Sequence, residues 1–347
     1  MSLDAENQKV GSLAVLGSGS WGTVLACLFS RRARRVTLWS RSSDSARSIQ
    51  QTRANDRYLP GFRLPDNIEV TADLCRATTE ASIIVIATPS FAVGETCGQI
   101  ASYIGPDTLV ISGAKGLESS TGRRMSEVVE ACIPGVGDRL VALSGPNLAR
   151  EMVADMPTAT VVASRTPGPA RQIQASLSLP RLRIYTNPDV VGVELGGALK
   201  NIVAIAAGIT DGLGYGENTK AALMSRGLTE IRRLGRALGA VDATFSGLSG
   251  IGDLYATCAS NKSRNHKVGF ELGRGRKLSE ILESMDQISE GVLTTDAALL
   301  LASQTGVEMP ITRGLHQILF ENASPREIVS ALMARAHTSE GECEDEG

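Results

Sequence analysis

A glycine-rich segment near the start of the chain has the spacing of a phosphate-binding turn. Gly17, Gly19 and Gly22 follow the apolar run 13–16 and precede the apolar segment 23–29, an order that predicts strand, turn and helix. In a GxGxxG segment the first glycine allows a tight turn, the second lets the backbone approach a pyrophosphate, and the third lets the helix pack on the strand. Glycine turns without a ligand are the alternative, but the flanking strand and helix favour a dinucleotide site.

The residues at the end of the second predicted strand bear on which dinucleotide binds. An NAD-binding chain commonly has an Asp or Glu about 20 residues beyond the glycines, where it holds the ribose 2′-hydroxyl. Here the chain has Ser40, Arg41 and Ser42 and no acid. Guanidinium and hydroxyl groups suit a 2′-phosphate, so we expect NADPH or NADP in preference to NADH or NAD. The alternative is that Arg41 is a surface cation that stacks on adenine.

A lysine stands inside the most apolar long stretch of the chain, residues 190–209. Helical spacing places Lys200 on one face with Val193, Gly197 and Ala204. Burial disfavours the ammonium form and lowers the pKa of a lysine, which suits it to proton transfer near neutral pH. We therefore expect Lys200 to be catalytic; a structural lysine paired with a core carboxylate is the alternative. The adjacent Asn201 would hydrogen-bond substrate or cap local structure.

An acid and a donor triplet follow in the second half of the chain. Asp253 stands in the glycine-rich segment 247–254, and Ser263, Arg264 and Asn265 follow it. Arginine offers a bidentate fork to a phosphate, with hydroxyl and amide donors beside it. We expect the triplet to bind a phosphate and Asp253 to orient substrate hydroxyls. A helix N-cap at Ser263 would account for one residue of the triplet.

Three predicted strands end in polar or glycine-bearing segments, at 89–90, 113–116 and 145–147. In open α/β sheets ligands lie beyond the carboxyl ends of the strands. Lys115, held between glycines, could reach both a cofactor and an anionic substrate; a plain surface-loop lysine is the alternative. Gly145 and Asn147 are candidates for substrate contact.

The elements that must position these residues form two series. Short apolar runs alternate with helical segments in the first half, which predicts a Rossmann-like, doubly wound and mainly parallel sheet. The expected strands are 12–16, 36–39, 68–71, 82–87, 108–112, 140–144, 158–163 and 182–185. Beyond Pro188 the pattern is helical, and the expected helices are 190–209, 218–238, 278–285, 291–304 and 312–320. We expect a dinucleotide-binding domain at 1–188, an all-α substrate domain at 189–337 and a disordered acidic tail at 338–347.

Composition and charge exclude several classes of protein. The net charge of -2 gives no basic field for nucleic acid. The six cysteines are scattered without a CxxC pair or a Cys/His cluster, so neither a metal site nor a redox pair is expected. The polar N-terminus does not have the pattern of a secretory signal, and charged residues interrupt the stretch 190–209, so we expect a cytoplasmic protein without stable membrane insertion.

Taken together, these residues resemble the soluble NAD(P)-dependent glycerol-3-phosphate dehydrogenases of bacterial type. The resemblance covers almost the whole chain. The matching segments are Gly17 to Gly22, Asn55 to Pro60 as NxxYLP, Lys115 to Leu117, Gly145-Pro146, Lys200-Asn201, Asp211 to Lys220 as DGLGYGENTK, Gly252-Asp253 and Ser263 to Asn265.

The resemblance implies reversible NAD(P)H-dependent reduction of dihydroxyacetone phosphate to sn-glycerol 3-phosphate, which feeds phospholipid synthesis, in a homodimer. It makes Lys200 the proton donor and acceptor. It implies substrate contacts at Lys115, Gly145, Asn147, Asp253, Ser263, Arg264 and Asn265. It implies cofactor contacts at Ser20, Trp21, Arg41, Tyr58, Lys115, Ala149, Arg264, Ile288 and Glu290.

The chain departs from the family pattern in two places. Asn147 stands where many bacterial members have Ser or Thr, and Arg34 with Arg35 replaces the usual glycine-bearing turn before the second strand. We interpret the basic run 31–35 as a solvated helix end. Two other functions fit part of the pattern: a different two-domain NADP-linked hydroxy acid or ketone dehydrogenase, and a non-catalytic NADPH sensor.

Overall fold

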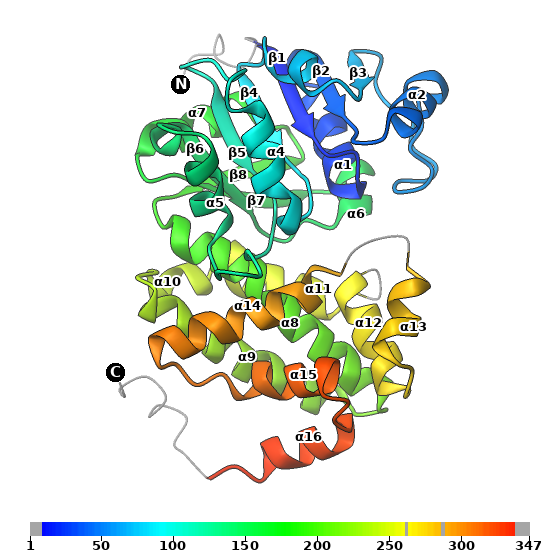
Figure 1. The fold of residues 1–347 in the computed structure, drawn as a ribbon, viewed down its shortest axis with the longest axis vertical. Helices are drawn as coiled ribbons and strands as arrows, with labels where there is room; N and C mark the ends of the chain where they lie inside the picture. Colours follow the sequence, from blue (N-terminus) through cyan, green and yellow to red (C-terminus); the bar gives the residue numbers. More distant parts are fainter. Residues whose placement is uncertain (1–8, 261–262, 286–288, 337–347) are drawn as a thin grey trace. The chain divides into compact units, whose positions relative to one another are not determined.

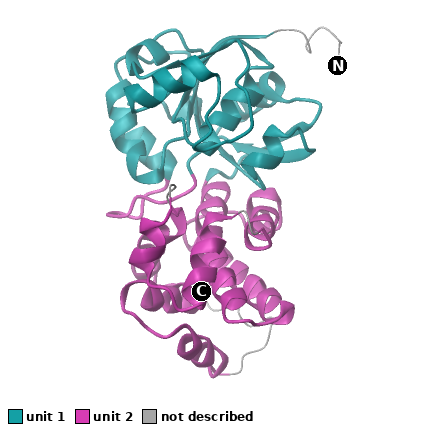
Figure 2. Ribbon diagram, turned by 90° about the vertical axis from the view of Figure 1, so that its right-hand side faces the viewer, with its two compact units in different colours: residues 1–114, 125–190 teal, residues 115–124, 191–347 magenta. Residues whose placement is uncertain are grey.

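The computed structural model describes residues 9–260, 263–285 and 289–336, which form two compact units (Figures 1 and 2). Unit 1 comprises residues 1–114 and 125–190, and unit 2 comprises residues 115–124 and 191–347. Segment 115–124, which the sequence analysis assigned to the first domain, thus belongs to unit 2. The reason is local packing: Leu117 lies in the core of unit 2, and Arg124 pairs with Glu194 at 2.9 Å.

Unit 1 is built on an eight-stranded sheet in the order β3-β2-β1-β4-β5-β6-β7-β8. Its strands are β1 Val10–Leu16, β2 Ala33–Trp39, β3 Ile68–Thr71, β4 Ile83–Ile86, β5 Leu109–Ser112, β6 Leu140–Ser144, β7 Thr158–Ala163 and β8 Leu182–Asn187. All neighbouring strands are parallel except β6 and β7. The predicted doubly wound, mainly parallel sheet is confirmed, and its chain order reverses between β1 and β4, where ligands of such sheets bind.

Helices cover both faces of this sheet (Figure 1). They are α1 Ser20–Phe29, α2 Ser43–Thr52, α3 Leu74–Thr78, α4 Val93–Ile100, α5 Met125–Cys132, α6 Ala149–Val153 and α7 Pro167–Leu177, with short 3-10 turns at Ser90–Ala92 and Gly137–Arg139. In β1, Leu13 and Val15 pack in one core with α1, while Ala14 and Leu16 pack in another with α4 and α5. Alternate residues of a strand face opposite sides of a sheet, so burial of both faces produces the continuous apolar runs seen in the sequence.

Unit 2 is helical, as predicted. Its helices are α8 Val190–Gly212, α9 Glu217–Ala237, α10 Asp242–Phe245, α11 Asp253–Cys258, α12 Arg264–Gly273, α13 Leu278–Glu283, α14 Glu290–Thr305, α15 Pro310–Phe320 and α16 Pro325–Met333, with a π turn at Leu248–Gly252. Helix α8 is long and apolar enough to cross a membrane, but 83% of its most apolar window is buried inside the protein. It is therefore placed as a core helix, around which the others pack.

The basic run 31–35 is exposed at Arg31, Arg34 and Arg35, as predicted, but it is not the end of a helix. Helix α1 ends at Phe29 and β2 begins at Ala33, so Arg34 and Arg35 lie on a strand. Arg35 pairs with Glu80 at 2.6 Å, and Arg32 donates to the carbonyl oxygen of Ser176 at 3.1 Å. The run thus covers the turn after α1 and the first residues of β2, and Arg32 and Arg35 tie it to neighbouring segments. The predicted tail 338–347 and Ile288 lie outside the described residues.

Candidate functional site

The glycine turn after β1 has the geometry that a phosphate requires. Gly17 has a φ of 115°, and a Cβ there would lie 2.7 Å from the carbonyl oxygen of Ala87. A Cβ at Gly22 would lie 1.9 Å from the carbonyl oxygen of Gly17, so α1 packs directly on the turn. At Gly19, by contrast, a Cβ would meet no atom within 4 Å, and no side chain caps α1. An open backbone approach therefore lies at a helix N-terminus, whose N–H groups and dipole favour an anion.

Side chains from other segments fasten this turn. Asn55, in the NxxYLP segment, donates to the carbonyl oxygen of Ser18 and to the hydroxyl of Thr23, both at 2.8 Å. Trp21 donates its indole N–H to the carbonyl oxygen of Gly113 at the end of β5, at 3.0 Å. Asn55 and Trp21 therefore hold the turn in place. The sequence analysis did not assign Asn55 to the site; its place in a motif of the resembling family was the available signal.

The remaining cofactor residues predicted in unit 1 are Arg41, Tyr58 and Ala149. Arg41 is exposed in the turn between β2 and α2, directly after Ser40, whose hydroxyl accepts from Ser18 at 2.8 Å. Tyr58 is half-buried beneath the guanidinium of Arg57, which lies 5.2 Å from the ring centroid. Ala149 is the first residue of α6 and packs against the core that contains α1.

Buried polar atoms without a hydrogen-bond partner among the described residues lie at or just beyond the ends of β4, β5 and β6. They are Thr88 Oγ1, Ser112 Oγ, Ser144 Oγ and Asn147 Oδ1. The amide of Asn147 donates to Thr160 Oγ1 at 3.0 Å, and Gly145 is buried with a φ of 124°. Most buried polar groups in folded proteins are satisfied. Four unsatisfied atoms near the carboxyl ends of three strands therefore indicate a place for polar ligand groups or water.

In unit 2 one buried carboxylate holds two lysines. Asp253 Oδ2 lies 2.8 Å from Lys115 Nζ, and Asp253 Oδ1 accepts a hydrogen bond from Lys200 Nζ. Lys200 also donates to Thr257 Oγ1 at 2.9 Å. Asp253 is 1% exposed and Lys200 is 6% exposed. Two cations against one anion leave this cluster with a net positive charge when both lysines are protonated, which suits an anionic substrate.

The pKa of Lys200 is lowered to about 8, first because burial penalises the ammonium form. Asp253 raises this pKa and partly offsets the burial, while the neighbouring Lys115 lowers it further. The amine can therefore exchange a proton near neutral pH. Lys200 is thus paired with a core carboxylate, as the alternative of a structural lysine requires. Its pKa is nevertheless lowered, as a proton donor and acceptor requires.

Close backbone packing explains the glycine-rich segment before Asp253. A Cβ at Gly196 in α8 would lie 2.3 Å from the carbonyl oxygen of Ser249, and a Cβ at Gly250 would lie 2.0 Å from that of Phe245. The glycines thus let segment 247–252 lie against α8, which carries Lys200. Thr257 follows Asp253 by one turn of α11, and that i, i+4 spacing was the signal by which sequence reasoning could have found it.

A chain of amides connects the other predicted substrate residues. Asn265 Nδ2 donates to Asn201 Oδ1 at 2.9 Å, and Asn201 Nδ2 lies 3.4 Å from the carbonyl oxygen of Lys115. Asn265 Oδ1 accepts from the Ser289 hydroxyl at 2.6 Å and from the Gly291 N–H at 3.0 Å. Asn265 thereby caps α14, the helix that begins at the predicted cofactor residue Glu290. Sequence reasoning did not identify Ser289.

The first turn of α12 presents the remaining members of the triplet. The Ser263 hydroxyl accepts from the N–H of His266 at 3.3 Å, which is the N-cap weighed as an alternative. Arg264 is exposed, whereas Ser263 and Asn265 are buried. Burial nevertheless lowers the pKa of its guanidinium, and the charge of Glu290, the first residue of α14, opposes this shift.

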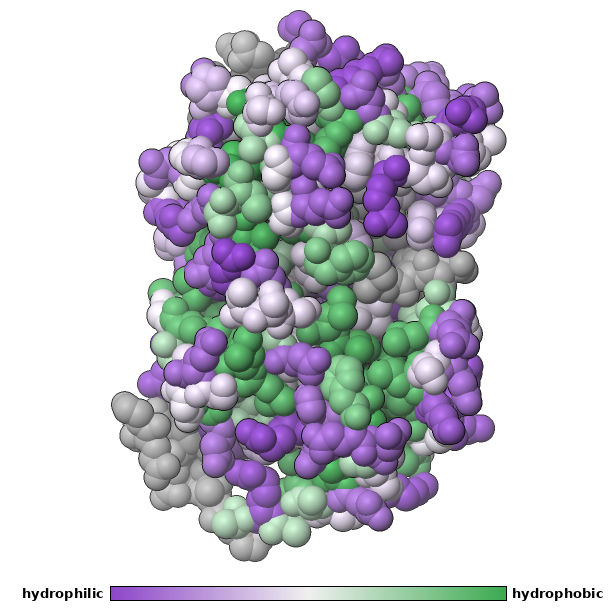
Figure 3. All heavy atoms as spheres, viewed as in Figure 1, coloured by the Kyte–Doolittle hydropathy of each residue, from purple (hydrophilic) through white to green (hydrophobic). Residues whose placement is uncertain are grey.

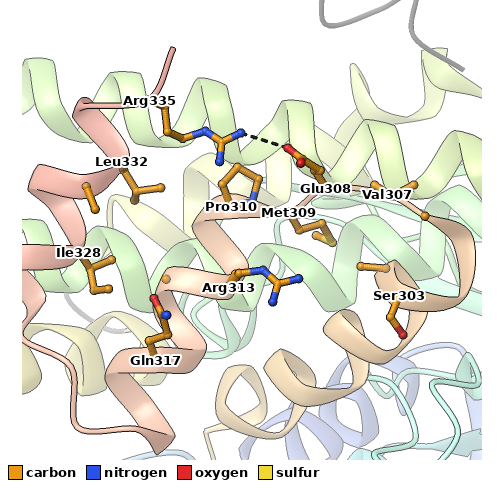
Figure 4. Close-up of a pocket in the computed structure, with 14 residues that line it drawn as sticks. Ser303, Val307, Glu308, Met309, Pro310, Arg313, Gln317, Ile328, Leu332 and Arg335 are labelled. Carbon is orange, nitrogen blue, oxygen red and sulfur yellow. Dashed lines mark hydrogen bonds and ion pairs between the residues drawn. The ribbon is translucent and has the colours of Figure 1, made fainter.

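A cavity of about 400 Å³ also lies in unit 2, beside the end of α14 and along α15 and α16 (Figure 4). Met309, Arg313 and Leu332 are among its lining residues, and Arg335 pairs with Glu308 at 3.1 Å. None of the residues predicted to bind substrate or cofactor lines it, so it is not the candidate site. No group of three potential metal ligands was found within the described ranges.

Comparison with known proteins matches both halves of the chain. Residues 12–169 match the family model described as NAD-dependent glycerol-3-phosphate dehydrogenase N-terminus, and residues 189–330 match the corresponding C-terminus model. The chain is 49% identical over 333 residues to glycerol-3-phosphate dehydrogenase (NAD(P)+) of Pelotomaculum thermopropionicum, covering 96% of this chain and 95% of that protein. It is 47% identical to the protein of that name from Geobacillus kaustophilus, covering 95% and 96%. The crystal structure of glycerol-3-phosphate dehydrogenase from Coxiella burnetii, 39% identical, superposes with a TM-score of 0.90 and covers 94% of this chain and 99% of that one.

Proposed function

The chain belongs to the NAD-dependent glycerol-3-phosphate dehydrogenase family, and we propose that it catalyses the reversible NAD(P)H-dependent reduction of dihydroxyacetone phosphate to sn-glycerol 3-phosphate. The observation that carries the proposal is the buried carboxylate of Asp253 with Lys115 and Lys200 on either side. This arrangement places an acid–base amine in a positively charged setting. The product would supply glycerophospholipid synthesis.

The residues of unit 1 fit the dinucleotide. The open approach at Gly19, the N-terminus of α1 and the unsatisfied atoms near the ends of β4 to β6 offer donors and acceptors to an anionic, polar group. When bound, NAD(P)H supplies the hydride that reduces C2 of the substrate. Gly17, Gly19, Ser20, Trp21 and Gly22 would hold its pyrophosphate.

Lys200 supplies the proton. In reduction, its ammonium N–H donates to the C2 oxygen as that oxygen gains the charge of an alkoxide, and the amine is reprotonated from solvent. In oxidation the neutral amine removes the hydroxyl proton. A pKa of about 8 leaves both forms accessible near neutral pH. Among the described residues Asp253 and Thr257 take two of its three N–H groups, which leaves one for the substrate.

Asp253 and Lys115 complete the electrostatics of this step. The Asp253 carboxylate orients Lys200 and favours its charged form, while the second cation stabilises negative charge on the substrate. Arg264 would bind the phosphate through its bidentate fork. Asn201 and Asn265 hold one another and the N-terminus of α14, so part of their role is to position this surface.

One assay tests the proposal. NADPH absorbance is followed with dihydroxyacetone phosphate and with unphosphorylated dihydroxyacetone, in the wild type and in Lys200→Ala. In the wild type we expect rapid oxidation with the phosphorylated ketone and slow but measurable oxidation with the unphosphorylated one, and in the variant loss of rate without loss of NADPH binding. An NADPH sensor would bind the cofactor without turnover, and a different ketone reductase would not prefer the phosphate.

Three further properties belong to the same proposal. Arg41 favours NADPH over NADH. The protein is a cytoplasmic enzyme, consistent with burial of α8, the one helix of the described ranges that is long and apolar enough to cross a membrane. It forms a homodimer; apolar side chains gather on the face of unit 2 seen in Figure 3, and Phe320 and Met333 are exposed. Light scattering after gel filtration tests the dimer.

A further inference from the structure

A second ion cluster lies in unit 2, and the reaction proposed above does not use it. Asp211, near the end of α8, has its Oδ2 atom 2.7 Å from His266 Nε2 and 2.9 Å from Lys220 Nζ. His266 is buried, and the side chains of Asp211 and Lys220 are 21% and 16% exposed. The three groups come from α8, α9 and α12, so the cluster connects three helices that are separate in sequence.

Backbone contact brings α12 against α8 at this point. A Cβ at Gly208 would lie 2.0 Å from the carbonyl oxygen of His266, and a Cβ at Gly212 would lie 2.2 Å from that of Phe270. From the other helix, a Cβ at Gly269 would lie 1.9 Å from the carbonyl oxygen of Ile205. The two main chains therefore touch without intervening side chains, which places the His266 ring next to Asp211.

The helix turn that His266 holds is the one that carries the phosphate triplet. Ser263 caps it through the His266 N–H, and Asn265 ties it to α8 and α14. His266 adds the third attachment, to Asp211. Between these buried attachments Arg264 is exposed. A small rotation of this turn would displace the guanidinium, and bidentate recognition of phosphate depends closely on orientation.

We propose that His266, Asp211 and Lys220 are positioning residues that set selectivity for a phosphorylated substrate. They do so by fixing the orientation of the first turn of α12, which begins with Arg264. The inference rests on the proposed function. Lys220 pairs with the same Asp211 oxygen and orients it toward α12. Hydrogen bonding to Asp211 raises the pKa of Lys220, which keeps that side chain charged.

Selectivity is the readout that separates positioning from general stability. For Asp211→Asn and His266→Leu, we expect kcat/KM for dihydroxyacetone phosphate to fall roughly 10- to 100-fold, mainly through KM. Turnover of unphosphorylated dihydroxyacetone stays at the wild-type level, because it does not use Arg264. His266→Gln retains an amide donor for Asp211 and restores most of the activity.

His316→Leu is the matched control. It removes the other described histidine that contacts carboxylates, those of Asp296 and Glu321, at 3.2 and 3.1 Å. We expect it to leave the rates with both ketones at the wild-type level. Equal losses on both ketones, or no loss on either, would overturn the proposal. If His266→Leu does not fold, Asp211→Asn and His266→Gln decide the question. A wild type that does not reduce dihydroxyacetone phosphate refutes the proposed function instead.

Discussion

Lys115 and Asp253 are 138 residues apart in the sequence, yet their Nζ and Oδ2 atoms lie 2.8 Å apart. The other oxygen of the same carboxylate accepts from Lys200. Asp253 thus keeps two ammonium groups close together inside unit 2, and this charge arrangement governs the first two predictions.

Lys200→Ala removes the proton donor and the positive charge next to the reacting oxygen. We expect kcat to fall by about 10³-fold or more, since loss of several kcal/mol of transition-state stabilisation has that effect. The NADPH dissociation constant, measured by fluorescence titration, stays at the wild-type value. Lys267→Ala, which changes an exposed lysine of α12, serves as the control, and a comparable loss there would refute the role of Lys200.

Asp253→Asn leaves Lys115 and Lys200 without their shared anion. Because Asp253 raises the pKa of Lys200, its removal lowers that pKa further. The ammonium form that reduction requires is then lost at a lower pH, so the descending limb of the kcat profile for reduction shifts to lower pH. Unfolding should become easier by roughly 3 kcal/mol, the cost of breaking a buried pair. A profile that shifts upward would contradict the assignment.

Glu230→Gln tests a buried carboxylate that caps α15. Its oxygens accept from the N–H groups of Ile311 and Thr312 at 2.5 and 3.2 Å, and burial raises its pKa from 4.5 to about 7. Between those two pH values the folded protein holds a proton that the unfolded chain releases, so the ionisation of Glu230 makes stability fall as pH rises, by roughly 3 kcal/mol in total. This contribution is absent from the variant.

Thermal unfolding at pH 5 and pH 8 measures the difference. We expect the wild type to lose more stability than Glu230→Gln between these pH values. Glu308→Gln changes an exposed carboxylate that pairs with Arg335 and should retain the wild-type pH dependence. Parallel curves for the wild type and Glu230→Gln would show that the carboxylate is not protonated in the folded state.

Arg41→Ala addresses cofactor preference. The guanidinium is exposed directly after Ser40, and it would pair with a 2′-phosphate that NADH lacks. We expect KM for NADPH to rise about 10-fold or more, as loss of a charge-assisted pair implies, with KM for NADH unchanged. Equal increases for both cofactors would indicate adenine stacking instead.

Gly196→Ala tests the packing that brings Asp253 to Lys200. The new methyl group would lie 2.3 Å from the carbonyl oxygen of Ser249, so segment 247–252 must move away from α8. We expect lower thermal stability, by about 1–3 kcal/mol as for other overpacked sites, together with reduced kcat. Gly98→Ala is the matched control at an exposed position of α4, where a Cβ would meet no atom within 4 Å. It should raise stability by about 0.5–1 kcal/mol.

Much of this molecule is determined by local sequence. The apolar runs of β1 to β8 predict a sheet buried on both faces because alternate residues must enter two cores, and the structure confirms it. The GxGxxG spacing predicts the turn at Gly17 to Gly22, since only glycine tolerates the close backbone approaches at Gly17 and Gly22. The apolar surroundings of Lys200 predict a helix and a buried amine.

Tertiary structure alone decided which charges meet. No spacing in the chain shows that segment 115–124 packs with unit 2, or that Asp253 is shared by Lys115 and Lys200, because these contacts depend on how helices pack rather than on neighbours in sequence. The run 31–35 misled sequence reasoning for the same reason: Arg35 pairs with Glu80, and Arg32 donates to the carbonyl oxygen of Ser176, so the partners come from distant segments. Local patterns select helices, strands and turns, whereas the partner of a buried charge is selected by the whole packed unit.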